Sequence, residues 1–249
     1  MSTKLSKRQK RRLRNEGIDL VEEQNNNGIH LKSVVAKTKN QQMIFDKFNN
    51  KHLMVHGYAG TGKTYVLLYL ALRSVLNPNT PYKKVKVFRS AVPTRNLGFL
   101  PGNVVAKMES FELPYIDIIA DLVQNELIGQ NAYAILKHKS LIEFHPTSYL
   151  RGATYNDAII LVDECQNLNW HEFSSLITRC GQNSKYVFSG DSTQSDLEKP
   201  YVRMDIHRMI AICKAMPSFD LICMEMDDIV RSGLVKEFLI HSEALGYGT

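Results

Sequence analysis

The stretch HLMVHGYAGTGKTYVLLYLALRSVL (His52–Leu76) contains the patterns that decide the fold. Its first part, HLMVHG, is a short apolar run typical of a buried β-strand. The segment KTYVLLYLALRSVL (Lys63–Leu76) is apolar over the length of a helix, and Pro78 and Pro81 follow where that helix would end. The order strand, glycine-rich loop and helix predicts the first unit of an α/β domain.

The loop between them, GYAGTGKT (Gly57–Thr64), has the composition of a phosphate-binding loop. Its glycines allow a tight turn with N–H groups directed inward, and the helix that follows adds the positive end of its dipole. Lys63 is placed to reach the β- and γ-phosphates, and the Thr64 hydroxyl is placed to ligate Mg²⁺. The full G-x-x-x-x-G-K-[ST] pattern therefore predicts binding of ATP with Mg²⁺. The residues expected to contact the nucleotide in this region are Gly57, Tyr58, Ala59, Gly60, Thr61, Gly62, Lys63, Thr64 and Tyr65.

After the loop, the chain alternates short β-type runs with helical patterns. This alternation is typical of a mostly parallel sheet with helices on both faces. The further predicted strands are Val85–Ser90, Ile142–Pro146, Ala158–Glu164, Lys185–Asp191 and Asp220–Met226. The further predicted helices are Trp170–Cys180, Met204–Ala215 and Leu234–Ala244, with a helical region that is broken at Pro114 and runs to about Ile128. We expect one α/β domain over residues 29–249.

Acidic side chains follow two of the most apolar strands. Asp163 and Glu164 end the run AIILVDE, where one acid is placed to hold the metal and its neighbour to polarise an attacking water. A kinase needs only the first acid, because its substrate supplies the nucleophile, so Glu164 favours an ATPase. Asp191 and Gln194 follow the next buried strand, and Gln194 is a candidate sensor of the γ-phosphate.

Composition describes a chain of 249 residues with 44% hydrophobic residues and a net charge of +6. Four cysteines without a Cys-x-x-Cys pair favour a reduced, cytoplasmic protein without a structural metal, and no apolar run is long enough to span a membrane.

Residues 1–28 are expected to form a flexible arm. The basic residues at its start are Lys4, Lys7, Arg8, Lys10, Arg11, Arg12 and Arg14. Such an arm attracts nucleic acid through its phosphates, and the alternative is a tail that only aids solubility.

Several motifs in this order closely resemble the PhoH-like family of ATPases, phage-type members included. They are GYAGTGKT, VFRSAVPTRNLGFLPGN, HPTSYLRGATYNDAIILVDECQN and FSGDSTQSDL. The resemblance covers roughly Lys39 to Val235. It implies a P-loop NTPase fold with a RecA-like sheet, similar to the first motor domain of superfamily 1 helicases. In such a sheet the KYVFSGD strand lies between the strands that end at Gly57 and Asp163.

The resemblance also implies roles for single residues. Gln41 is the expected reader of the adenine edge, with Gln42 as the neighbouring alternative. Arg151 and Arg231 are expected cations of the active site or of a subunit interface. Arg89 is a weaker candidate, because the Arg-Pro pair frequent in the family reads Arg-Ser here.

These observations predict Mg²⁺-dependent ATP binding and hydrolysis, coupled to binding or helicase-like remodelling of RNA or single-stranded DNA. The location would be the cytoplasm, which is the host's cytoplasm if a phage encodes the protein. Superfamily 1 motors use two such domains, so we expect a homo-oligomer, and the resemblance to RecA-like ATPases implies a hexameric ring in which a neighbour supplies an arginine. The alternatives are a nucleotide-dependent binding switch and, third, a P-loop small-molecule kinase.

Overall fold

The computed structural model describes residues 29–90, 104–147, 152, 154–192 and 206–245. Its strands are β1 (His52–Gly57), β2 (Lys84–Arg89), β3 (Ile142–Pro146), β4 (Ala158–Asp163), β5 (Lys185–Gly190) and β6 (Phe219–Met224). Its helices are α2 (Lys39–Lys47), α3 (Lys63–Leu76), α4 (Val104–Leu122), α5 (Glu126–His138), α6 (Trp170–Ile177), α7 (Ile206–Ala215) and α8 (Gly233–Ala244), with short 3₁₀ turns η2 (Cys165–Asn167) and η3 (Met226–Asp228). None of the described helices is long and apolar enough to cross a membrane.

The strands form one parallel sheet in the order β3-β2-β4-β5-β1-β6. As predicted, β5 lies between β1 and β4, so the phosphate-binding loop after β1 and the acids after β4 and β5 reach the same edge of the sheet. Every residue of β4 and β5 is buried, because a strand in the middle of the sheet is covered on both faces. The predicted fold class is confirmed: a P-loop NTPase α/β fold with a RecA-like parallel sheet and helices on both faces.

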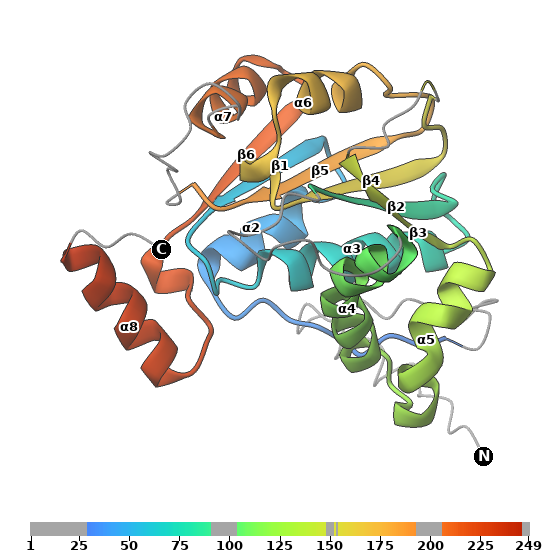
Figure 1. The fold of residues 1–249 in the computed structure, drawn as a ribbon, viewed down its shortest axis with the longest axis horizontal. Coiled ribbons are helices and arrows are strands. Elements are labelled where there is room, and N and C mark those ends of the chain that lie inside the picture. The colour runs from blue at the N-terminus through green and yellow to red at the C-terminus, as the bar shows by residue number, and fades with distance from the viewer. Residues whose placement is uncertain (1–28, 91–103, 148–151, 153, 193–205, 246–249) are drawn as a thin grey trace, which may run out of the picture.

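Helices cover the two faces of the sheet separately (Figure 1). Successive side chains of a strand point to opposite faces. Leu53 and Val55 of β1 therefore pack in one hydrophobic cluster with α2, α3, α4 and α5, whereas Met54 packs in a second cluster with α6 and α7. α8 stands to one side of this layered body.

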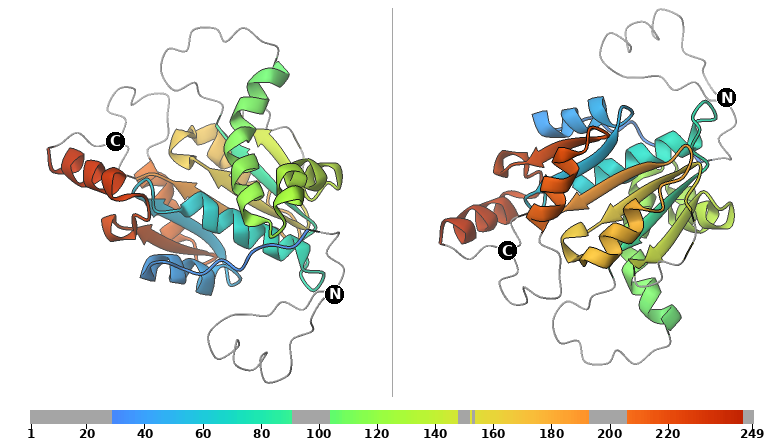
Figure 2. Two further views of the ribbon diagram at one scale, coloured as in Figure 1. Left: turned by 90° about the horizontal axis from the view of Figure 1, so that it is seen from below. Right: turned by 90° about the horizontal axis from the view of Figure 1, so that it is seen from above.

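One helix prediction was wrong. α4 continues through Pro114 and ends only at Leu122, and it extends past the body of the sheet (Figure 2). A proline costs a helix one backbone hydrogen bond, and here Tyr115 and other residues of α4 are buried against the sheet and α5, which offsets that loss. The break comes at Asn125, whose side chain caps the separate helix α5.

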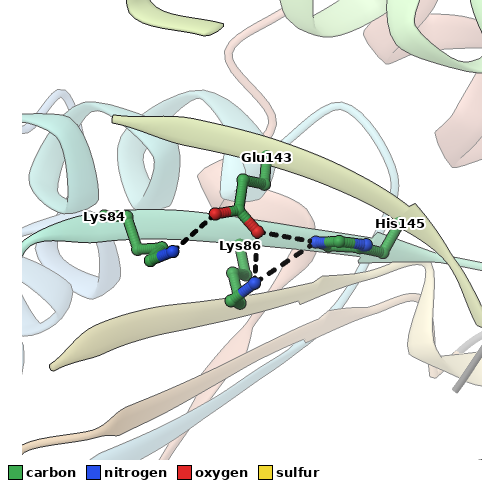
Figure 3. A network of polar contacts seen from close by, with 4 residues as sticks. All are labelled: Lys84, Lys86, Glu143 and His145. Carbon is green, nitrogen blue, oxygen red and sulfur yellow. Dashed lines mark hydrogen bonds and ion pairs between the residues drawn. The ribbon is translucent and has the colours of Figure 1, made fainter. Parts of the chain in front are cut away.

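At the β2–β3 edge of the sheet, a polar network occupies the face opposite α3 (Figure 3). The carboxylate of Glu143 accepts hydrogen bonds from Lys84 Nζ at 2.6 Å and from Lys86 Nζ. It also lies 3.0 Å from Nε2 of His145, whose ring stacks on Phe88. Although burial opposes the charged form, the hydrogen bonds from Lys84, Lys86 and His145 lower the pKa of Glu143 to about 2. Charges on an edge strand also discourage pairing with another chain.

Candidate functional site

The phosphate-binding loop leaves β1 at Gly57 in a conformation that needs glycine. The φ angle of Gly57 is 125°, and a Cβ there would lie 2.0 Å from the carbonyl oxygen of Met224 on β6. Gly60 and Gly62 also have positive φ angles, 76° and 79°. The backbone of the loop therefore turns tightly through conformations that favour glycine at these three positions.

Lys63, the first residue of α3, has a buried side chain that reaches back across the loop. Its Nζ donates hydrogen bonds to the carbonyl oxygens of Gly57 at 2.8 Å and Tyr58 at 2.7 Å. Burial lowers the pKa of Lys63, and the nearby acids, Asp191 first, oppose that shift. The ammonium group is thus positioned at the loop, where a phosphate would exchange with the carbonyl contacts.

Thr64 and Asp163, the two residues expected to hold Mg²⁺, are in direct contact. The Thr64 hydroxyl donates to Oδ1 of Asp163 at 2.9 Å, and Asp163 is 3% exposed at the end of β4. Among the described residues no group of three or more His, Cys, Asp and Glu side chains could hold a metal. A hydroxyl and one carboxylate nevertheless fit Mg²⁺, which usually binds through one or two protein oxygens together with phosphate and water.

Glu164 lies just beyond β4 with a left-handed φ angle of 51°, which is uncommon for a residue other than glycine. Burial, and secondarily the charge of Asp163, raises the pKa of Glu164. The side chain of Gln166 donates through Nε2 to Glu164 Oε2 at 2.6 Å and accepts through Oε1 from the backbone N–H of Asp191 at 3.0 Å. Gln166 thus connects the ends of β4 and β5, a role that sequence reasoning missed.

Several of these groups line one pocket of about 830 Å³, whereas Gly57, Tyr58, Asp163 and Gln166 are not part of its wall. It brings together the loop residues Ala59–Tyr65 with Gln41, Glu164, Asp191 and Arg231. Its wall also contains a part that the sequence did not predict, formed by Lys32, Ser33, Val34, Val35, Lys37, Ile118 and Asp121. Tyr65 donates its hydroxyl to Asp121 at 2.8 Å, which joins α3 to α4 in this wall.

Gln41 lies on α2, is 3% exposed, and contacts the phosphate-binding loop. Its Nε2 donates to the carbonyl oxygen of Thr61 at 2.9 Å, and its Oε1 accepts from the backbone N–H of Lys37 at 2.8 Å. The expected contact of Gln41 with adenine stays a prediction, and Gln42 instead donates to Asp46 on the exposed side of α2.

Arg231 lies at the phosphate-binding loop of its own chain. Its Cγ is 3.0 Å from the position that a Cβ on Gly60 would take, and the neighbouring Val230 donates its N–H to the Gly60 carbonyl oxygen at 3.1 Å. Arg89 ends β2 directly opposite Asp163 in the strand register. Arg151 and Gln194 lie outside the described residues, as does the arm over residues 1–28.

Comparison with known proteins gives relatives over most of the chain. A "PhoH-like protein" of Bacillus subtilis is 31% identical over 84% of this chain and 63% of its own length. A "PhoH-like protein" of Mycobacterium bovis is 32% identical over 84% of this chain and 57% of its own, so the chain spans about 60% of the length of these relatives. Among solved structures, the large terminase of a thermophilic bacteriophage superposes with a TM-score of 0.46 at 15% identity, covering 80% of this chain and 48% of the terminase.

The family model for PhoH-like proteins matches residues 33–242. That range contains β1 to β6, the loop with Lys63 and Thr64, the acids after β4 and β5, and Arg231. The chain therefore belongs to the PhoH-like family.

Proposed function

We propose that this protein binds ATP with Mg²⁺ and hydrolyses it. The observation that carries the proposal is one glycine-lined pocket at the carboxyl ends of β1 and β4 that contains Lys63, Thr64 and Glu164, with Asp163 hydrogen-bonded to Thr64 beside it. Ligands of open parallel sheets bind at that edge. Each group has a place in phosphoryl transfer, where catalysis is mostly positioning and charge stabilisation.

The loop and Lys63 form the phosphate-binding part. The backbone N–H groups of the loop would bind phosphate oxygens, and the start of the α3 helix adds its positive dipole end. The Lys63 ammonium, now on the carbonyls of Gly57 and Tyr58, would move to the β- and γ-phosphates and stabilise the charge that builds up during transfer.

Thr64 and Asp163 would hold Mg²⁺, which neutralises charge on the β- and γ-phosphate oxygens when bound. Glu164 would orient a water molecule and accept its proton. The raised pKa of Glu164 makes its carboxylate a stronger base than an exposed one, and the hydrogen bond from Gln166 fixes its direction. An ATPase is favoured over a kinase because Glu164 and Gln166 form an ordered unit suited to activating water.

We further propose that hydrolysis is coupled to RNA or single-stranded DNA, and that the protein works as a homo-oligomer in the cytoplasm. The coupling to nucleic acid is supported by the run of basic residues between Lys4 and Arg14, together with the net charge of +6. A nucleotide-dependent binding switch would use the same pocket without translocation.

The test is release of inorganic phosphate from ATP, measured with Mg²⁺ or with EDTA, and with or without a single-stranded polynucleotide. We expect release that needs Mg²⁺ and rises with the polynucleotide. The matched variant Glu164→Gln keeps the shape and hydrogen-bonding capacity of the side chain, so it should bind ATP without splitting it. Transfer of the phosphate to a metabolite instead of water would favour the kinase, and hydrolysis unaffected by polynucleotide would favour the switch.

A further inference from the structure

A buried tyrosine contacts the carboxylate assigned to the metal. Tyr115 lies on α4, is 1% exposed, and donates its hydroxyl to Oδ2 of Asp163 at 2.8 Å. Its ring packs against Phe144 of β3, with 5.5 Å between ring centroids. No sequence motif pointed to Tyr115, because it lies 48 positions before Asp163 and outside every nucleotide-binding pattern.

The two oxygens of Asp163 have different partners. Oδ1 accepts from Thr64, the residue on the nucleotide side, whereas Oδ2 accepts from Tyr115 on the protein side. In this contact the Tyr115 hydroxyl is the donor and Oδ2 of Asp163 is the acceptor. Hydrogen bonds to a charged group are about twice as strong as those between neutral groups. With Thr64 on Oδ1 and Tyr115 on Oδ2, the two contacts together fix the rotation of this carboxylate.

We infer that Tyr115 is a positioning residue for the cation site: its hydroxyl holds Oδ2 of Asp163, so that Oδ1 stays directed at Thr64 and the cation. The inference rests on the proposed function, since it assumes that Asp163 and Thr64 serve Mg²⁺. It adds a residue of α4 to a site otherwise built from the loop and the ends of β4 and β5. Partners that orient metal ligands typically change metal affinity by about 10- to 100-fold when they are removed.

The variant Tyr115→Phe removes the hydroxyl and keeps the ring that packs on Phe144. The chain also offers a matched control. Tyr133 of α5 is another buried tyrosine, and it donates its hydroxyl to the carboxylate of Glu112 at 2.6 Å, with neither residue in the pocket wall. Tyr133→Phe therefore loses the same kind of buried hydrogen bond away from the nucleotide, and thermal melting of both variants shows whether each remains folded.

The measurement is the affinity of fluorescent ADP in EDTA, followed by titration of Mn²⁺ or Mg²⁺ into the ADP complex. We expect Tyr115→Phe to keep the EDTA affinity within about twofold of the wild type and to weaken cation binding about tenfold or more. Tyr133→Phe should leave both values unchanged. In an Asp163→Ala background, Tyr115→Phe should cause no further loss, because the group that it positions is gone.

Two results would overturn the inference. One is an unchanged cation affinity in folded Tyr115→Phe, and the other is an equal loss with and without Asp163. Failure of the proposed function is recognised separately. The wild-type protein would then bind no ADP, or its ADP affinity would not change when the cation is added.

Discussion

The Thr64 hydroxyl donates a hydrogen bond of 2.9 Å to Oδ1 of Asp163, although 99 positions separate the two residues in the chain. Thr64 is the second residue of the helix that follows β1, and Asp163 ends β4, two strands away in the sheet. The parallel order of the strands brings these ends to one edge. The groups proposed to bind Mg²⁺ are therefore positioned by the fold itself, which lowers the cost of organising the site around a nucleotide.

Lys63→Ala should abolish most ATP turnover and leave the fold intact. The ammonium group is lost from the place where transition-state charge develops, and loss of one such stabilising donor typically costs about 10²- to 10³-fold in rate. Steady-state phosphate release measures the effect, with circular dichroism as the check on folding. A folded Lys63→Ala protein with nearly wild-type turnover would contradict the role assigned to the loop.

Gln166→Leu should lower turnover by about 10²-fold while ATP affinity stays within about twofold of the wild type. The leucine cannot hold Glu164 or the Asp191 N–H, so the proposed base loses its orientation, and small misplacements of catalytic groups cost about this much. Separate measurements of kcat and of ATP affinity show whether the variant loses turnover alone or also loses binding. If ATP binding falls as much as kcat, then Gln166 supports the whole pocket and not the base alone.

Part of this site could be predicted from the sequence because its motifs are local. The loop Gly57–Thr64 and the acids Asp163 and Glu164 stand at the ends of apolar runs typical of buried strands, and those strands formed almost as predicted. Gln166 was missed because its role depends on how the chain turns after β4 and directs the side chain to Glu164 and the Asp191 N–H, which the sequence does not reveal. The wall formed by Lys32–Lys37 was missed for the same reason, since nothing nearby in the sequence reveals which segment crosses the pocket.

Glu143→Gln should destabilise the protein at neutral pH by about 1–2 kcal/mol, after allowance for solvent screening of a partly exposed group. The folded-state pKa of Glu143, about 2, lies below its ordinary value of 4.5. Its stabilising contribution is therefore present above about pH 4.5 and is lost as the pH falls toward 2. Urea unfolding between pH 3 and 7 measures the free energy of unfolding, which should fall less steeply with decreasing pH for Glu143→Gln than for the wild type. Asp117→Asn, at an exposed position of α4, is the control that should follow the wild-type curve.

Deletion of residues 1–28 should weaken binding to single-stranded nucleic acid and flatten its dependence on salt. Each lost contact between a basic side chain and a phosphate should reduce the slope of log K against log salt by about 0.7 for a single strand. Fluorescence anisotropy with a labelled oligonucleotide at several salt concentrations measures the slope, and basal ATP hydrolysis should survive the deletion. An unchanged slope would make the arm a solubility tail.

Arg231→Ala should lose turnover but keep most of its ATP affinity, because an arginine at the γ-phosphate acts mainly in the transition state and contributes about 10³- to 10⁵-fold in rate. The sequence left open whether Arg231 acts in its own active site or across a subunit boundary, and in the structure Arg231 lies over Gly60 of its own chain. We therefore expect Arg231 to serve the nucleotide of its own chain. Mixing Arg231→Ala with Lys63→Ala subunits separates the two arrangements, provided that subunit exchange is verified with labelled protein. An arginine acting within its own chain leaves the mixture inactive, because each subunit lacks one required group. Recovery of activity in the mixture, together with a ring-sized mass by light scattering, would show that the arginine acts on a neighbour's nucleotide and would overturn the assignment made from the position of Arg231.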